Sequence, residues 1–267
     1  MSECLFCRSQ GPFNTVEHIV PQSLGNDTDV LRGIVCDRCQ NYLSHDVEQP
    51  ALRSTPFAFW RTLLGIRTGK GRMPSVDMTP PKGGRIPAFH PLTDSVSLMA
   101  HDDGTCEVKF HDPIKHELVC SQKDGRTNLV LAPYHLSVMG RMLGKMGLEY
   151  LASTDLERAF VVEFDELRHF VRRGSTHSLW PLYWGQDGEI RDLAGPVTVE
   201  ISSISWDIEC YRFALGQIAS GEHVFAFAVG TDLWLICLSH RKEMQHLSKL
   251  VQGIEMSCVY YPDGSWE

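Results

Sequence analysis

The spacing of apolar and polar positions near the N-terminus predicts a strand at 16–20, then a loop at 21–29. Residues 30–35 lead from that loop to Cys36. Helical spacing then begins, and we expect a helix over 41–51. Residues 50–56 begin and end with proline, so we expect them to cross the surface.

Further along, the chain alternates between strand-like and helical patterns. Short runs bounded by Gly, Asp or Pro predict strands at 105–110, 128–132, 197–202, 208–213, 224–229, 233–238 and 256–261. From Leu136 onwards the apolar positions, including Met139, Met142 and Met146, recur at helical spacing. Two shorter helices are expected at 155–161 and 165–173, the second ending at a glycine. The predicted fold class is α+β with a mostly antiparallel sheet.

Glycine and proline are concentrated between residues 65 and 87, which predicts a linker or an exposed loop there. We therefore expect an N-terminal module at 1–60, a basic linker at 61–87 and a larger α+β domain at 88–267. The chain of 267 residues is long enough for one large or two modest domains. The sequence assigns no role to the larger domain beyond selecting a substrate or a partner.

Composition is that of an ordinary soluble protein, with 43% hydrophobic and 22% charged residues. No apolar run approaches the ~20 residues of a membrane-spanning helix, so no membrane partner is expected. No signal peptide is expected either, because Cys4 follows the initiating methionine almost at once. The scattered, odd-numbered remainder of the cysteines favours a reducing compartment, and we predict a cytoplasmic protein.

Four cysteines near the N-terminus stand in two C-x-x-C pairs, Cys4/Cys7 and Cys36/Cys39. Paired thiols at this spacing are typical of a tetrahedral zinc site, since Zn²⁺ binds four thiolates at about 2.3 Å. A thiol sensor built on two redox pairs is a weaker interpretation, because nothing near them resembles a redox βαβ unit. We therefore predict a structural Zn²⁺.

Between the two pairs lies an adjacent carboxylate and imidazole, Glu17-His18. Hard divalent ions such as Mg²⁺ prefer carboxylate and amide oxygens, and an imidazole beside them can take a proton from an attacking water. Asn41 follows the last cysteine by two residues, and His45 lies four further on, on the same face of a helix.

These residues resemble the HNH endonuclease family, in its zinc-knuckle subgroup. The resemblance covers residues 1 to about 50. It rests on both cysteine pairs, Glu17-His18-Ile19-Val20-Pro21, Leu24-Gly25-Asn26 and Asn41. It implies a ββα-metal fold, in which a hairpin carries the catalytic histidine and a helix completes the metal site. It also implies metal-dependent cleavage of phosphodiester bonds in nucleic acid.

Carried over position by position, His18 is similar to the family's general base and Glu17 to its first metal ligand. Asn41 is similar to the helix-borne amide ligand. Gln40 departs from the pattern, since many relatives have Asn or His directly after the last cysteine. The resemblance therefore leaves the remaining ligand open among Asn41, His45 and Gln40, in that order. The catalytic ion it implies is Mg²⁺ or another divalent cation.

A one-sided run of basic residues follows the predicted module. Arg67, Lys70 and Arg72 are its central members, and we predict that they contact phosphate. The net charge of −8 argues only mildly against nucleic acid as the partner, since phosphate contacts are local. DNA is favoured over RNA, and a protein partner or a homo-oligomer stays open.

Two functional interpretations remain. The first is a metal-dependent HNH endonuclease, favoured by the Glu17-His18 pair. The second is a catalytically degenerate, zinc-stapled module that binds nucleic acid or protein, and Gln40 favours it.

Overall fold

The computed structural model describes most of the chain. The described residues are 3–68, 70–79, 95–102, 106–111, 118–123, 126–130, 133–174, 179–186, 211–218, 221–230, 232–242, 244 and 257–258. The predicted strand at 197–202 lies outside them.

A two-stranded hairpin opens the fold. Strand β1 (Val16–His18) pairs antiparallel with β2 (Val30–Arg32), so that Glu17 lies opposite Leu31. The connection contains a short 3₁₀ turn, η1 (Gln22–Leu24), which ends at Gly25 with a φ of 92°. Glycine adopts this left-handed conformation without steric cost. The predicted hairpin is confirmed.

Four short helical segments follow. Their bounds are α1 (Asp37–Leu43), the π-helical turn η2 (Ser44–Glu48), α2 (Gln49–Ser54) and α3 (Pro56–Leu63). The prediction that residues 50–56 cross the surface is wrong, because Ala51 and Leu52 are buried within a helix. Pro50 fits there because it stands in the first turn of α2, where the ring's missing N–H costs least.

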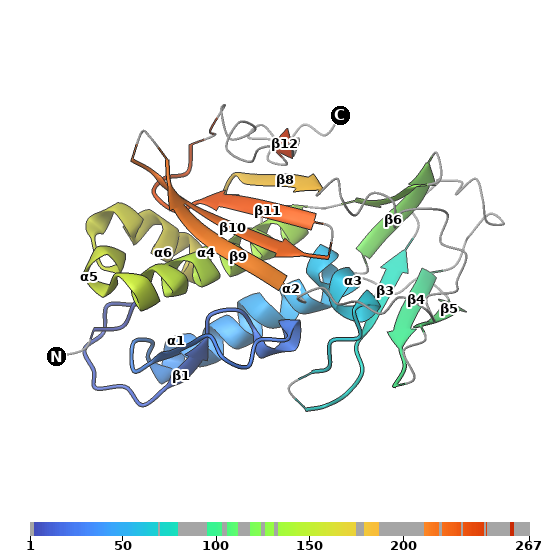
Figure 1. Cartoon of the computed structure of the whole chain (residues 1–267), viewed down its shortest axis with the longest axis horizontal. Helices are drawn as coiled ribbons and strands as arrows, with labels where there is room; N and C mark the ends of the chain where they lie inside the picture. Colours follow the sequence, from blue (N-terminus) through green and yellow to red (C-terminus); the bar gives the residue numbers. More distant parts are fainter. Residues whose placement is uncertain are drawn as a thin grey trace.

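Helix α4 (Pro133–Thr154) runs through the middle of the molecule (Figure 1). Met139, Met142 and Met146 are wholly buried, which confirms the predicted apolar stripe. The helix packs closely against Phe225 at Gly147, because glycine has no side chain. A Cβ at that position would lie only 2.9 Å from Phe225. It is followed by α5 (Leu156–Ala159), η3 (Val162–Phe164) and α6 (Asp165–Arg173).

Two five-stranded sheets complete the described structure. The first has the order β12-β8-β11-β10-β9 and is antiparallel throughout. Its strands are β8 (Leu182–Gln186), β9 (Tyr211–Gln217), β10 (His223–Val229), β11 (Asp232–Cys237) and β12 (Ser257–Cys258). Helix α4 lies between this sheet and the N-terminal helices (Figure 1).

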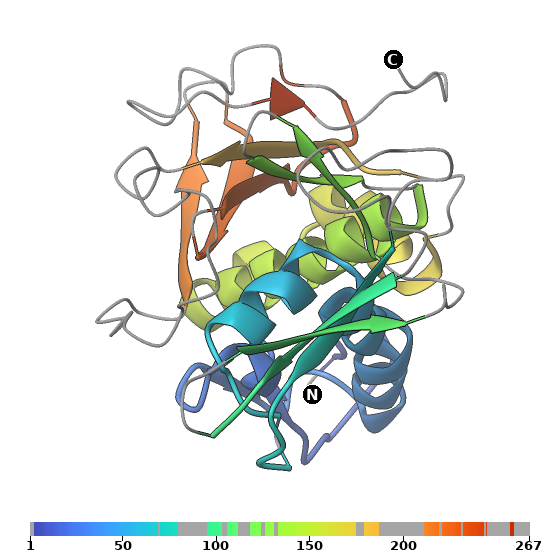
Figure 2. The same cartoon turned by 90° about the vertical axis from the view of Figure 1, so that its right-hand side faces the viewer.

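The second sheet has the order β5-β4-β3-β6-β7 and stands beside α3, as Figure 2 shows from the side. Its strands are β3 (Ser75–Thr79), β4 (Ser95–Ala100), β5 (Cys106–His111), β6 (Leu118–Lys123) and β7 (Arg126–Val130). Only β3 and β6 pair in parallel among these strands. The α+β class with mostly antiparallel sheets is thus confirmed, and β3 lies within the range predicted as a linker.

One buried core joins the N-terminal hairpin to the rest of the described chain. Its apolar side chains come from the cysteine knuckles, the N-terminal helices, α4, α6 and the first sheet. Phe57 of α3 meets Phe227 and Trp234 edge-on, and the Trp60 indole donates a hydrogen bond to Asp232 at 2.7 Å. The aromatic residues of α3 therefore dock the N-terminal part on the sheet. No helix among the described residues is long and apolar enough to cross a membrane.

Candidate functional site

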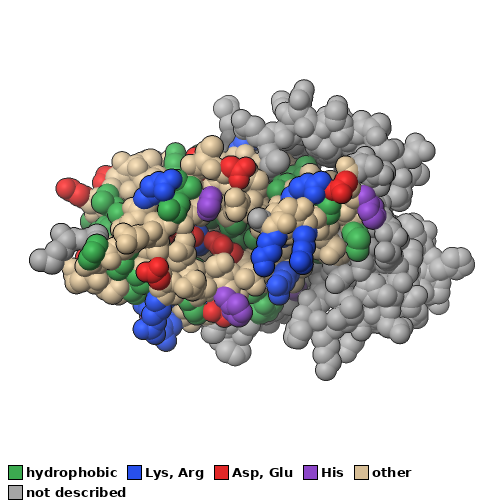
Figure 3. Space-filling model, turned by 90° about the horizontal axis from the view of Figure 1, so that it is seen from below, with side chains coloured by type: hydrophobic (Ala, Val, Ile, Leu, Met, Phe, Trp, Pro, Cys, Tyr) green, Lys and Arg blue, Asp and Glu red, His purple; other side chains and the backbone are tan. Residues whose placement is uncertain are grey.

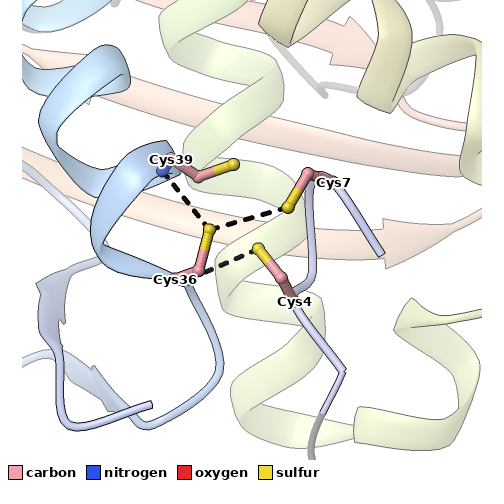
Figure 4. Close-up of side chains that lie close together, drawn as sticks. All are labelled: Cys4, Cys7, Cys36 and Cys39. Carbon is pink, nitrogen blue, oxygen red and sulfur yellow. Dashed lines mark hydrogen bonds between the residues drawn. The ribbon is translucent and has the colours of Figure 1, made fainter. Parts of the chain in front are cut away.

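The four cysteine side chains of the two pairs meet at one point (Figure 4). Cys4 and Cys7 come from the N-terminal loop, while Cys36 caps α1 and Cys39 lies in its first turn. All four sulfur atoms lie within 4.8 Å of one another. Backbone N–H groups of Cys36 and Cys39 point at sulfur, at 3.3 and 3.4 Å. This is a suitable set of donors for Zn²⁺, and the predicted zinc site is confirmed as a cluster of four thiols.

The thiols differ in acidity because they share protons. The pKa of Cys4 is lowered to about 4, chiefly because the Cys39 thiol donates a hydrogen bond to it. The pKa of Cys39 is raised for the same reason, since that thiol keeps the proton. A metal ion must displace this proton to bind, so zinc affinity falls as the pH is lowered.

Glu17 and His18 lie on opposite faces of strand β1, as successive residues of a strand do. Glu17 is buried, and His18 is half-buried. The strand is held to the first helix by Gln40, whose side-chain amide donates to the Val16 carbonyl at 2.6 Å. Gln40 therefore links α1 to β1. At this position many members of the HNH family have Asn or His, and here the glutamine amide has a structural use.

Asn26 fixes the loop that leads from His18 to β2. Its buried side-chain amide donates to the carbonyls of Val20 and Asp29 at 2.8 and 3.0 Å. Its oxygen accepts from the backbone N–H groups of Thr28 and Asp29, at 3.0 and 2.8 Å. A buried amide whose hydrogen bonds are all made to backbone groups holds the loop in one conformation. The signal available in the sequence was an asparagine directly after the turn glycine.

The Glu17 carboxylate lies in a buried acidic cluster centred on an ammonium group. Lys145 of α4 places its Nζ 2.9 Å from Glu17 Oε1, 2.8 Å from Glu48 Oε1 and 2.9 Å from Glu149 Oε2. The same Nζ donates to the carbonyl of His18 at 3.1 Å. We call Glu17, Glu48, Glu149 and Lys145 the Lys145 cluster. Sequence reasoning missed its last three members, although Lys145 and Glu149 interrupt the apolar stripe of α4 at i, i+4 spacing.

Burial and mutual repulsion shift the pKa values of the Lys145 cluster. Burial raises the pKa of Glu17, and it raises the pKa of Glu149 well above its ordinary value, in spite of the nearby ammonium. For Lys145, burial alone would lower the pKa, but the carboxylates of Glu149, Glu48 and Glu17 raise it well above its ordinary value. Lys145 therefore stays positively charged inside the protein.

The helix-borne residues proposed as metal ligands, Asn41 and His45, are exposed, whereas Glu17 is buried. Asn41 is exposed on α1, and the His45 side chain is 76% exposed and pairs with Asp46 at 3.4 Å. No hydrogen bond or ion pair between either of them and Glu17 is found in the part of the chain that the structure describes. The structure thus brings Glu17 together with Glu48, and it leaves Asn41 and His45 at the surface.

The predicted phosphate-binding residues lie on an exposed turn after α3. The turn is closed by the Thr68 N–H, which donates to the Arg72 carbonyl at 2.9 Å. Lys70 and Arg72 are exposed, whereas Arg67 forms an ion pair with Asp102 and donates to the Gly71 carbonyl. Figure 3 shows a face of the molecule with acidic side chains near its middle and a group of Lys and Arg side chains beside them. Phosphate contact by these residues stays a prediction.

The N-terminal part of the chain can now be compared with known proteins. Residues 4–56 match the HNH endonuclease family. We call these residues the HNH segment, and the match confirms the resemblance over that range. Comparison with curated proteins and with solved structures finds no match.

A divalent ion fits the HNH segment on chemical grounds. Glu17 and Glu48 provide the hard oxygen atoms that Mg²⁺ prefers. Glu17 Oε2 is buried and has no hydrogen-bond partner among the described residues, although its neighbour Oε1 is paired with Lys145. A buried carboxylate oxygen without a partner is costly, and a bound cation would satisfy it.

Proposed function

We propose that this protein is a metal-dependent endonuclease that hydrolyses phosphodiester bonds in nucleic acid, with DNA favoured over RNA. One observation carries the proposal: within an HNH segment, a half-buried imidazole and a buried carboxylate alternate on one strand. The thiol cluster joins the start of that segment to α1, and Lys145 joins Glu17 to Glu48, so the strand has a defined position. A reducing, cytoplasmic location belongs to the same proposal, because the four thiol ligands of zinc stay reduced there.

In this mechanism, His18 accepts a proton from a water molecule as that water attacks phosphorus. The bond from phosphorus to the leaving 3′-oxygen then breaks. A divalent cation bound beside Glu17 would stabilise the negative charge that develops on the phosphate and the leaving oxygen. The chain's own part is to hold His18 in place, through Lys145 at its carbonyl and through Asn26 in the following loop.

The competing function is a zinc-stapled module that binds nucleic acid without cutting it. Two observations favour it: the Glu17 carboxylate is already paired with Lys145, and the amide of Gln40 is used to tie α1 to β1. The half-buried position of His18 favours the enzyme, because a purely structural hairpin does not need an imidazole there.

A cleavage assay on supercoiled plasmid and on RNA separates the two functions. We expect cleavage in the presence of Mg²⁺ or Mn²⁺ and its loss when a chelator removes the added ion. Zinc should be measured before and after chelation, so that loss of the structural ion is not mistaken for loss of the catalytic one. Binding without cleavage in any metal, on either substrate, would establish the non-cutting module instead.

The exposed turn after α3 provides a second prediction. Replacing Arg67, Lys70 and Arg72 together by glutamine should weaken binding to all sequences alike. The slope of log affinity against log salt should fall by about one unit per lost phosphate contact. Lys70 and Arg72 should contribute more than Arg67, since Arg67 is already paired with Asp102.

The matched control for this prediction neutralises Arg173 and Lys242, two exposed basic residues outside the turn. Binding and its salt dependence should be measured by titration at several ionic strengths. An unchanged slope in the triple variant would show that the turn is only a solvated surface.

A further inference from the structure

We propose that Glu48 is the second protein ligand of the catalytic divalent ion, opposite Glu17, and that Lys145 is the positioning residue that holds both carboxylates. The inference rests on the proposed function for the role of the ion, but the binding of the ion can be tested separately. It replaces the residues to which the sequence points, Asn41, His45 and Gln40, by one that lies further along the helical segment.

The carboxylates of Glu17 and Glu48 converge on one nitrogen atom. Glu17 belongs to strand β1 and Glu48 to the end of η2, yet Oε1 of each lies within 2.9 Å of the same nitrogen atom, Lys145 Nζ. Both contacts are ion pairs. The two carboxylates therefore face one another across a single small group. Mg²⁺ in phosphoryl-transfer sites is commonly held by one or two such carboxylates and completes its shell with water and substrate oxygens.

The helical segment that carries Glu48 is wound more widely than an α-helix. Residues Ser44–Glu48 form a π-helical turn, in which the Gln49 N–H donates to the Ser44 carbonyl. A π-turn changes the direction of the side chains that follow it, and such turns occur frequently at functional sites. Here His45 remains at the surface while Glu48, at 14% side-chain exposure, turns inward.

Carboxylate oxygens of the Lys145 cluster are buried without a hydrogen-bond partner in the described part of the chain. The Lys145 cluster contains three carboxylates and one ammonium group. Glu149 is fully buried on α4, and its Oε1 has no hydrogen-bond partner among the described residues; Glu17 Oε2 lacks one too. A divalent cation would provide the missing contact for the Glu17 oxygen.

Glu48 is also the carboxylate through which an ion can reach the cluster. Its side chain is 14% exposed, compared with 7% for Glu17 and 0% for Glu149. Lys145 holds one oxygen of Glu17 from the protein side. Glu149 extends from the same helix four residues further on, so it supports Lys145 rather than facing substrate.

The test is a titration of the zinc-loaded protein with Mn²⁺. Electron paramagnetic resonance measures the concentration of free Mn²⁺ at each step. Glu48→Gln should weaken Mn²⁺ affinity by at least about tenfold, because even the loss of an outer-shell partner costs a metal site 10- to 100-fold. Asp46→Asn is the matched control, since it removes the same charge two residues away at the surface, and it should bind Mn²⁺ like the unchanged protein. Zinc content should be equal in both variants.

Two rival variants, Asn41→Ala and His45→Ala, separate failure of this inference from failure of the proposed function. If Glu48→Gln binds Mn²⁺ normally and one of these two does not, the inference is wrong while the metal-dependent nuclease stands. If the unchanged protein binds no Mn²⁺ at millimolar concentration, the inference and the catalytic ion both fail. If Glu48→Gln does not fold, Glu48→Asp keeps the charge but withdraws the carboxylate by one methylene, and unaltered Mn²⁺ affinity in that variant overturns the inference.

Discussion

Replacing His18 by alanine should lower phosphodiester cleavage by roughly 10² to 10⁴-fold, the usual contribution of a positioned general base. Folding and zinc content should stay unchanged, because His18 is not one of the four thiol ligands. Substrate affinity should hardly change either, since the imidazole acts on water and not on the phosphate backbone. Single-turnover cleavage at saturating substrate measures the first part of this expectation. Circular dichroism with elemental analysis for zinc measures the second, and a substrate-binding titration measures the third.

His169→Ala is the matched control for His18→Ala, because His169 is an exposed histidine on α6. Glu17→Ala should behave differently from both: it should raise the Mg²⁺ concentration needed for activity, since it removes a ligand. Full activity in His18→Ala would exclude His18 as the base. Loss of zinc or unfolding in that variant would instead make His18 a structural residue.

Replacing Lys145 by methionine should lower the free energy of unfolding by about 3–5 kcal/mol, the cost of removing one partner from a buried ion pair. Methionine keeps most of the length of the side chain, so the effect arises from charge and not from a cavity. It leaves Glu17, Glu48 and Glu149 facing one another without an ammonium between them. Urea unfolding of the zinc-loaded protein is the measurement.

Lys242→Met provides the control, because Lys242 is exposed and surface substitutions change stability by only about 0.5 kcal/mol. A loss below about 1 kcal/mol in Lys145→Met would be typical of a surface ion pair. Such a result would mean that the carboxylates are not held by this ammonium in solution.

The parts of the site that could be predicted are those in which neighbours in sequence are neighbours in space. The zinc ligands come in two pairs, each separated by two residues, and this spacing brings two thiols to one side of a turn. The strand that contains Glu17 and His18 was visible for the same reason, and so was α4, whose buried methionines recur at helical spacing. The pairing of that strand with a second strand was expected only from the resemblance to the HNH family.

The Lys145 cluster could not be predicted in this way, since Lys145 and His18 are 127 residues apart. Which charged side chain meets Glu17 depends on how α4 packs against the hairpin, and that is decided by long-range burial. The inward turn of Glu48 depends in addition on a π-helical turn, for which the sequence carries no simple signal. Strand β3 was missed because its short alternating run, 75–79, lies among the glycines and prolines that favour a linker.

The distance along the chain between the HNH segment and its counter-ion matters during synthesis on the ribosome. The N-terminal part emerges first, with its thiols and the Glu17-His18 pair complete. Helix α4 begins only at Pro133, so a nascent chain that stops earlier has no ammonium group to order Glu17 and no sheet to cover Phe57. An unfinished product therefore carries Glu17 and His18 without the support that positions them. Under the proposed function, cleavage would therefore begin only after α4 has been synthesised and has packed against the hairpin.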